Sequence, residues 1–216
     1  MIKLYGSFVS RATRNLWMLE ELGLEYEHVS LDWGKQENRS AEYLKINPAG
    51  KVPTLVDGEA TLSESLGINL YLADKYGAGG LWPEDDAARA RCIQWSFWGA
   101  AELEPLAYGR IREFMFKKES ERDAALVEDM AERTGPLLTL MALTLAESDY
   151  LAGGDFTLAD LNVACVVEYL ERSQFDFTPW PKVEAWYKRA YGRPANQKVQ
   201  DARAPIAAEM MKRLQR

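Results

Sequence analysis

The first 77 residues alternate between two patterns of hydrophobic and polar positions. Short apolar runs with a period near two predict strands, whereas apolar positions that repeat every three or four residues predict helices. We expect strands at residues 2–6, 26–31, 53–56 and 60–62, and helices at 13–22, 41–44 and 64–76. In this β-α-β-α-β-β-α order, two crossover connections precede a hairpin. The pattern therefore predicts a small mixed sheet covered by helices.

The pattern changes after a turn-rich stretch at residues 77–83. From Asp85 onward the apolar positions recur only with a helical period. Pro105 and Pro136 fall inside the first two expected helices and should kink or split them. The helices are expected at 85–117, 121–147, 157–172 and 181–191, followed by a C-terminal piece.

Together the two patterns predict a two-domain protein. Residues 1–77 should form a thioredoxin-like α/β domain, residues 78–86 a linker, and residues 87–216 an all-α helical domain. Within the helical domain, Thr157 and Asp160 are spaced like a capping box, which predicts that a helix begins there.

The strongest candidate for a binding site lies around the Val52-Pro53 pair. Val52 precedes a proline and is therefore pushed toward extended geometry, and Pro53 cannot donate to a sheet ladder. This leaves the Val52 backbone free to pair with the backbone of a ligand. Ser63 is expected to cap the next helix, with Glu64 and Ser65 in its first turn, where unpaired N–H groups would accept a carboxylate. The pattern predicts a site for a short peptide that carries its own α-amino and α-carboxyl groups.

Several short motifs, taken in order, resemble the glutathione S-transferase family. Their order and spacing are more specific than any one of them, and they cover nearly the whole chain. The resemblance implies that residues 1–77 bind reduced glutathione and that the enzyme conjugates its thiolate to a hydrophobic electrophilic small molecule. The matching segments are Leu4-Tyr5-Gly6-Ser7, Ser10, the helix that runs through Glu20-Glu21-Leu22 to Gly23-Leu24, Val52-Pro53, Glu64-Ser65, Asp149-Tyr150-Leu151-Ala152-Gly153 and Phe156-Thr157-Leu158-Ala159-Asp160.

Two hydroxyl residues could stabilise the thiolate of glutathione. An ordinary thiol has a pKa of about 8.5, and lowering it by about two units requires roughly 2.7 kcal/mol. A hydroxyl donor at the start of the first helix could supply that amount. We favour Ser10, which holds the loop position of the catalytic serine in theta-like, serine-type members of the resembled family, and keep Tyr5 as the alternative. The first cysteine is Cys92, so the first domain lacks a residue for mixed-disulfide chemistry.

The resemblance extends to the remaining binding residues and to the electrophile. Each of these residues also has a purely structural interpretation: the polar ones as ordinary helix-start or loop residues, and the tryptophans as core. We expect no metal. The expected glutathione-binding residues are Ser10, Arg39, Lys51, Val52, Pro53, Glu64 and Ser65, and the acceptor site is expected at Trp95, Trp98, Tyr108 and Arg112.

Composition narrows the possible partners and location. A net charge of −7 argues against a nucleic-acid partner, because the phosphate backbone calls for a clustered basic surface. No apolar run approaches the ~20 residues of a spanning helix and the first residues lack a secretory pattern, so we expect no membrane partner and a cytoplasmic protein. Cys92 and Cys165 lie far apart and are expected to be core residues. The resemblance also implies a homodimer.

The sequence leaves other functions open on the same fold. One is a non-catalytic module that binds glutathione or sequesters ligands. Another is a glutathione-dependent isomerase, lyase or peroxidase. All of them would share the binding residues, so the fold alone does not separate them.

Overall fold

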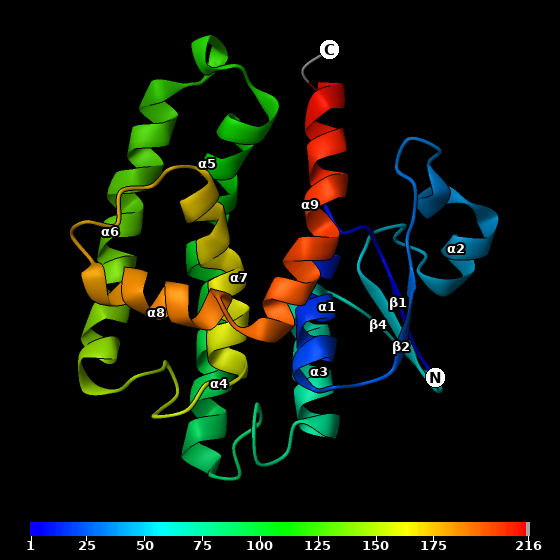
Figure 1. The fold of residues 1–216 in the computed structure, drawn as a ribbon, viewed down its shortest axis with the longest axis horizontal. Helices are drawn as coiled ribbons and strands as arrows, with labels where there is room; N and C mark the ends of the chain where they lie inside the picture. Colours follow the sequence, from blue (N-terminus) through cyan, green and yellow to red (C-terminus); the bar gives the residue numbers. More distant parts are fainter. Residues whose placement is uncertain (215–216) are drawn as a thin grey trace. The chain divides into compact units, whose positions relative to one another are not determined.

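The computed structural model describes the backbone of residues 1–214 and the side chains of residues 1–212. The chain divides into two compact units. The first unit combines Met1–Gly77 with the C-terminal segment that begins at Pro194, and the second comprises Ala78–Arg193 (Figure 1). The first unit is therefore built from two separate stretches of sequence.

The first unit contains a four-stranded mixed sheet in the order β2-β1-β3-β4. Strand β1 pairs in parallel with β2, and β3 runs antiparallel to both β1 and β4. The crossover-then-hairpin topology confirms the thioredoxin-like prediction. The strands are β1 (Ile2–Tyr5), β2 (Tyr26–Val29), β3 (Thr54–Asp57) and β4 (Ala60–Ser63).

Helix α1 occupies the centre of the helical layer of this unit, in contact with α3 and α9 (Figure 1). Because it is covered from two sides, most of its residues are buried, including Leu16, Trp17 and Leu19. The helices of the unit are α1 (Ala12–Glu21), α2 (Ala41–Ile46), α3 (Ser65–Tyr76) and α9 (Pro194–Leu214), with a 3-10 turn at Glu37–Arg39.

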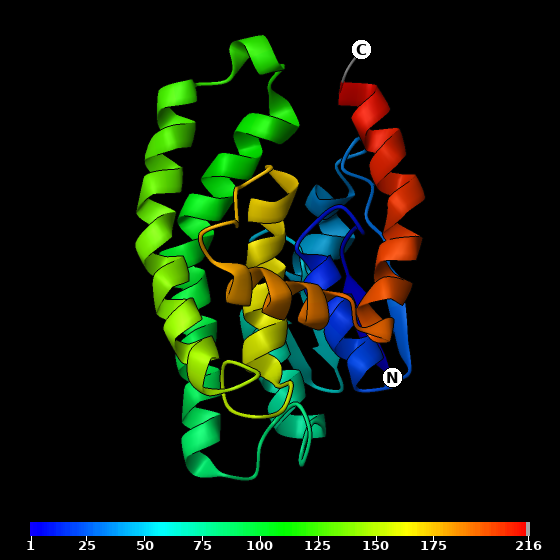
Figure 2. The ribbon, with the colours of Figure 1, turned by 60° about the vertical axis from the view of Figure 1, so that its left-hand side comes forward.

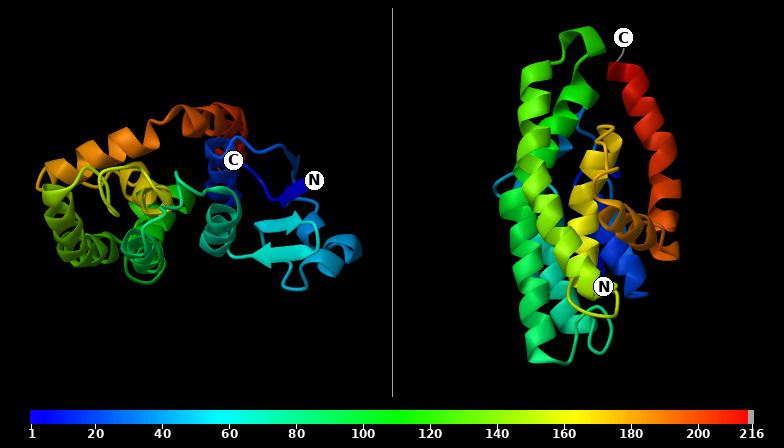
Figure 3. Two further views of the ribbon diagram at one scale, coloured as in Figure 1. Left: turned by 90° about the horizontal axis from the view of Figure 1, so that it is seen from below. Right: turned by 90° about the vertical axis from the view of Figure 1, so that its left-hand side faces the viewer.

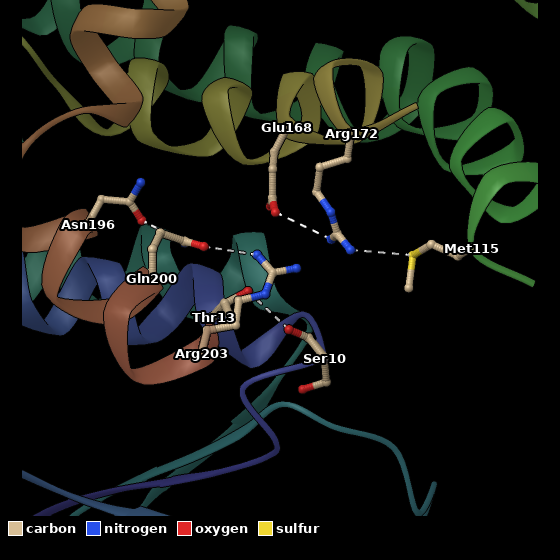
Figure 4. A network of polar contacts seen from close by, with 8 residues as sticks. All are labelled: Ser10, Thr13, Met115, Glu168, Arg172, Asn196, Gln200 and Arg203. Carbon is tan, nitrogen blue, oxygen red and sulfur yellow. Dashed lines mark hydrogen bonds and ion pairs between the residues drawn. The ribbon is translucent and has the colours of Figure 1, made fainter. Parts of the chain in front are cut away.

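Helix α9 differs from the domain boundaries expected from the sequence. The sequence predicts that the C-terminal piece belongs to the helical domain, within residues 87–216, whereas α9 packs on α1 and belongs to the first unit. The Nζ atom of Lys198 lies 2.6 Å from Oε2 of Glu20 on α1. Along α9 itself, Gln200 bonds to both Asn196 and Arg203 (Figure 4).

The second unit is helical throughout its regular structure, as expected. Its central helix, α7, packs against α4, α5 and α8 and is buried along almost its whole length (Figure 2). No helix described in residues 1–214 is long and apolar enough to cross a membrane. The helices are α4 (Asp86–Trp98), α5 (Glu104–Phe116), α6 (Ala124–Glu147), α7 (Leu158–Arg172) and α8 (Pro181–Tyr191).

The two prolines within the expected long helices have different effects. Pro105 lies in the first turn of α5, directly after a π-helical segment at Gly99–Leu103 that separates α4 from α5. The backbone stays helical from Asp86 to Phe116, so the first expected helix is interrupted by a wider turn beside Pro105 and is not broken. Pro136 lies inside α6, which continues without a break.

Helix α7 begins with the predicted capping box. Asp160 Oδ2 accepts from the backbone N of Thr157 at 3.0 Å and from its hydroxyl at 3.1 Å. The other oxygen, Oδ1, accepts from Leu151 N at 2.9 Å and from Trp186 Nε1 at 2.8 Å. Burial raises the pKa of Asp160, and these four donors oppose that rise. The carboxylate thereby fixes the preceding loop and α8 to the start of α7.

Candidate functional site

A tight corner after strand β1 brings Ser10 and Val52 together. Gly6 has φ +150°, and a Cβ built on it would lie 2.5 Å from Ala12 Cβ, 3.4 Å from Ser10 Oγ and 3.5 Å from Val52 Cβ. The closest of these contacts leaves no room for a side chain at position 6. The hydroxyl of Ser10 and the side chain of Val52 are therefore both within 3.5 Å of the same point.

The Ser10 hydroxyl lies at the start of α1 and is half-buried. It donates to the Ser7 carbonyl at 2.7 Å and accepts from the backbone N of Ala12 at 3.2 Å. The Thr13 hydroxyl donates to the Ser10 carbonyl at 3.0 Å (Figure 4). Because α1 has no acidic residue in its first turn, the partial positive charge of the helix N-terminus acts on this hydroxyl. Ser10 is thus placed to donate to an anion.

Tyr5, the alternative to Ser10, lies on the other side of the sheet. Successive side chains of a strand point to opposite faces, so Tyr5 is on the face opposite to the fully buried Leu4. Its ring centroid is 5.8 Å from that of Tyr43 on α2. Figure 3 shows α1 and α2 on opposite faces of the sheet. The Tyr5 side chain thus lies on the α2 side of the sheet, whereas Ser10 lies at the start of α1.

The loop before β3 presents the backbone of Val52. The Val52–Pro53 peptide bond is cis, and among the described residues no hydrogen bond is made by the N–H or C=O group of Val52. The preceding carbonyl, that of Lys51, accepts from the Tyr43 hydroxyl at 2.5 Å and from Asn47 Nδ2 at 2.9 Å. The loop is thus fixed from behind while the Val52 backbone can pair with a ligand.

Two cationic side chains lie on or over the same loop. The side chains of Arg39 and Lys51 are exposed. Arg39 Nη1 is 3.3 Å from the Ala49 carbonyl, and a Cβ on Gly50 would come within 2.7 Å of the same nitrogen. Lys51 directly precedes Val52 in the chain, and Arg39 contacts the loop two to three residues before Val52, as binding of a ligand carboxylate there would require.

The start of helix α3 corrects the predicted cap. We expected Ser63 as the N-cap with Glu64 in the first turn, but Ser63 ends β4 and Glu64 is itself the N-cap. Glu64 has φ 73° and ψ 107°, a backbone conformation that costs about 1–3 kcal/mol for a residue other than glycine. No side chain described in residues 1–212 caps this helix, so its first N–H groups have no side-chain acceptor.

A buried polar network that we did not predict connects α1 to this helix start. Arg14 Nη1 donates to Ser65 Oγ at 3.3 Å, and Asn15 Nδ2 donates to the Ser65 carbonyl at 2.8 Å. Asn15 Nδ2 also donates to Asn69 Oδ1 at 2.7 Å. The sequence signal was the polar pair Arg14-Asn15, inside the expected helix and directly before the apolar run that begins at Leu16. The network places a buried guanidinium beside Ser65, which favours binding of an anion there.

The predicted acceptor residues all lie in the helical unit and fall into two groups. Trp95 and Trp98 contact each other, with ring centroids 4.9 Å apart. Trp95 is only 5% exposed, in keeping with its alternative interpretation as a core residue. On α5, the Tyr108 ring is 5.6 Å from that of Tyr169, and Arg112 is exposed.

An open cleft of about 570 Å³ within the first unit was not predicted. It begins beside Ser7 and Val9, in the loop that leads to Ser10, and includes Trp33, which is 48% exposed. Its far wall is formed by Ile206 and neighbouring residues of α9. The cleft is mainly apolar and adjoins the loop that carries the Ser10 hydroxyl.

Comparison with known proteins identifies both parts of the chain. Residues 1–74 match the family described as "Glutathione S-transferase, N-terminal domain", and residues 104–194 match "Glutathione S-transferase, C-terminal domain". The chain is 32% identical over 202 residues to "Glutathione S-transferase GstB" of Escherichia coli (strain K12), with 92% of this chain and 97% of that protein covered. It is 34% identical over 206 residues to "Glutathione S-transferase 3" of Zea mays, with 92% of each covered.

A solved structure is similar over the same extent. It is the theta class glutathione S-transferase from the citrus canker pathogen Xanthomonas axonopodis pv. citri, with glutathione bound. The TM-score is 0.83 at 30% sequence identity, and the alignment covers 92% of this chain and 96% of that one.

Proposed function

Since this chain belongs to the glutathione S-transferase family and is a glutathione transferase, we propose how its own residues bind glutathione and activate the sulfur. The proposal depends mainly on one observation: the Ser10 hydroxyl and the Cβ of Val52, whose backbone makes no hydrogen bond among the described residues, lie within 3.5 Å of the same point at the Gly6 corner. A peptide paired with Val52 would bring its central side chain to Ser10. In glutathione, that side chain carries the thiol.

The charged ends of glutathione bind groups of opposite charge on either side of Val52. The Val52 N–H and C=O groups pair with the cysteinyl backbone. The γ-glutamyl carboxylate binds Ser65 and the first N–H groups of α3, with the guanidinium of Arg14 behind them, and Glu64 accepts from the ammonium group. Lys51 and Arg39 bind the glycyl carboxylate, and Pro53 holds the Val52 loop in place.

Ser10 lowers the pKa of the thiol by donating a hydrogen bond to the sulfur. Its single proton now points to the Ser7 carbonyl, so the hydroxyl turns from Ser7 to the sulfur when glutathione binds. The helix N-terminus adds to the stabilisation of the negative charge. The thiol proton leaves to solvent, and the thiolate then forms the S–C bond to an electrophile while any leaving group departs with its electron pair. This is the serine-type, theta-like chemistry implied by the sequence.

Substitution of Ser10 tests this role directly. Ser10→Ala should lower kcat about 10- to 100-fold, the equivalent of one to two pKa units in the bound thiol, with little change in glutathione affinity. Ultraviolet difference spectra of bound glutathione against pH measure the thiolate directly. Tyr5→Phe is the matched control and should leave the thiol pKa unchanged. The opposite pattern, with the pKa raised only in Tyr5→Phe, would transfer the role to Tyr5.

We propose that the electrophile binds in the apolar cleft beside Ser7 and Val9. In the helical unit, Trp95, Trp98, Tyr108 and Arg112 stay predicted acceptor residues. Trp33→Ala should raise KM for an aromatic electrophile and leave KM for glutathione unchanged. Equal effects on both substrates would place Trp33 outside the acceptor site.

We also propose a cytoplasmic homodimer. Ile93 and Phe97, four residues apart on one face of α4, are 41% and 64% exposed, an apolar surface that a second copy would cover. Cys92 and Cys165 are buried free thiols, in keeping with a reducing compartment. Light scattering should give about twice the 24.5 kDa chain mass, and Phe97→Asp should shift the protein toward monomer.

A further inference from the structure

Two fully buried asparagines connect the first turns of α1 and α3. Asn15 and Asn69 both have 0% exposure. The side chain of Asn15 crosses to α3, where it donates to the Ser65 carbonyl at 2.8 Å and to Asn69 Oδ1 at 2.7 Å. The side chain of Asn69 crosses in the other direction and donates to the Arg14 carbonyl at 3.4 Å. Each helix thus gives an amide side chain to a backbone carbonyl of the other.

These reciprocal hydrogen bonds connect the two segments that form the proposed glutathione site, one near Ser10 and one near Glu64. The Arg14 carbonyl is one turn from Ser10, and the Ser65 carbonyl directly follows Glu64. Apolar side chains could pack the two helices at the same distance, but they would allow the helices to slide or rotate. Directional bonds to two backbone carbonyls fix the register of one helix on the other.

The pair also carries an unsatisfied atom. Asn15 Oδ1 is buried and makes no hydrogen bond within the described chain. A buried polar atom without a partner destabilises the folded state, so a purely structural contact would be better made by apolar residues. At the same place, Glu64 is held at φ 73°, a conformation that persists only when its surroundings enforce it.

We propose that Asn15 and Asn69 are positioning residues that hold the strained Glu64 turn in register with Ser10, and so determine recognition of the γ-glutamyl end of glutathione. This inference rests on the proposed glutathione site. The asparagines touch neither the ligand nor the reacting sulfur. They act through the Ser65 carbonyl and the Arg14 backbone, which set the direction of the first N–H groups of α3 and of the Glu64 carboxylate.

Calorimetric titration of single and double variants tests the proposal. Asn15→Ala and Asn69→Ala should each weaken binding of reduced glutathione about 10-fold. The double variant should lose about 10- to 20-fold rather than 100-fold, because either substitution alone disables the pair. At saturating glutathione, kcat should stay within about 2-fold of wild type, since Ser10 is unchanged.

A control and a second ligand separate positioning from a general loss of stability. Asn162 is also 0% exposed and donates to Ser96 Oγ at 2.9 Å in the helical unit, so Asn162→Ala should lower Tm without changing glutathione affinity. A glutathione analogue that lacks the α-amino group of the γ-glutamyl residue should bind wild type more weakly than glutathione does. In both asparagine variants this discrimination should largely disappear, which a merely loosened domain would not produce.

The outcomes distinguish this inference from the function on which it rests. Unchanged affinity and unchanged discrimination in Asn15→Ala and Asn69→Ala, with wild type binding glutathione, would overturn the positioning role alone. A wild-type protein that does not bind glutathione would overturn both. If Asn69→Ala fails to fold, as judged by circular dichroism, Asn69→Asp takes its place. That variant keeps the acceptor for Asn15 and loses the donor to Arg14, and it should show a smaller loss of the same kind.

Discussion

The first turn of α7 is closed by side chains of its own unit, whereas no side chain in residues 1–212 caps the first turn of α3. At α7, Asp160 accepts four hydrogen bonds and Thr157 adopts an ordinary extended backbone. At α3, Glu64 is strained and exposed. The first turn of α7 is thus capped by side chains, whereas the first turn of α3 is not.

This contrast separates stability from binding. A helix N-terminus whose N–H groups are satisfied within the protein contributes to folding and has nothing left for a ligand. An open N-terminus gives up that stability and retains its donors and its partial positive charge for an anion. We therefore expect substitutions at α7 to act on unfolding and substitutions at α3 to act on glutathione affinity.

The largest effect is expected at Asp160. Asp160→Ala removes the acceptor of four donors, all of which belong to the buried residues Leu151, Thr157 and Trp186. The free energy of unfolding should fall by about 3–5 kcal/mol. Urea denaturation followed by tryptophan fluorescence measures the loss. Glutathione affinity of the folded fraction should match wild type, and a weaker affinity would show that the two helix starts are coupled.

An intermediate effect is expected at Glu64. Here a substitution should raise the free energy of unfolding, whereas Asp160→Ala lowers it. Glu64→Gly relieves the positive φ and should raise the free energy of unfolding by up to about 1 kcal/mol, the strain relief less the added freedom of the unfolded chain. The same change removes the acceptor for the ammonium group, so glutathione binding should weaken by about 1–3 kcal/mol. Paired denaturation and calorimetry check both signs.

Glu64→Gln is the matched control for that substitution. It keeps the strained backbone and the size of the side chain but removes the charge. Its stability should equal that of wild type while its glutathione affinity falls. Reduced stability in Glu64→Gly would mean that the backbone conformation at Glu64 is not strained.

The smallest effect is expected at the other end of α3, where three side chains of the helix donate to Asp57. Asp57 Oδ2 accepts from Tyr71 at 3.0 Å, from Lys75 at 2.7 Å and from Tyr76 at 2.7 Å. Burial alone would raise the pKa of Asp57, but the bonds from Lys75, Tyr76 and Tyr71 outweigh it and the pKa is lowered. A carboxyl whose pKa is lower in the folded state stabilises the protein above its unfolded pKa of about 4, and this contribution is lost as pH falls below that value.

Lys75→Met isolates this contribution from that of other carboxyl groups. It removes the Lys75 bond to Asp57, so the folded and unfolded pKa values of Asp57 move closer together. The urea midpoint of wild type should fall more steeply between pH 5 and about pH 2 than that of Lys75→Met. Parallel midpoint curves would show that the Asp57 cluster adds nothing to stability.

The local pattern of the chain was enough to predict most of the fold. Helix α8 covers the expected 181–191, and the capping box at Thr157 and Asp160 begins α7 as expected. Both depend on residues within a few positions of each other. The π-helical segment at 99–103 was not predicted as such, because its composition is that of an ordinary helix, although Pro105 two residues later indicates an irregularity there.

The sequence located parts of the candidate site but not their support. Val52 and Ser10 could be found from a proline and from motif spacing. The cap of α3 was misplaced by one residue, since residue preferences do not foresee a strained non-glycine such as Glu64. The bonds from Asn15 to Ser65 and Asn69 join residues about fifty positions apart. A single sequence carries no periodic signal for contacts of that kind.

The two-part construction of the first unit also has a consequence for biosynthesis. Helix α9 covers α1, yet it follows residues 78–193 in the chain. At about 5–20 residues per second, the ribosome completes α9 roughly 7–27 seconds after it adds residue 77. During that interval the nascent sheet domain lacks its outermost helix and leaves part of α1 accessible to chaperones. A premature stop codon in α9 would therefore damage the part of the protein that was made first.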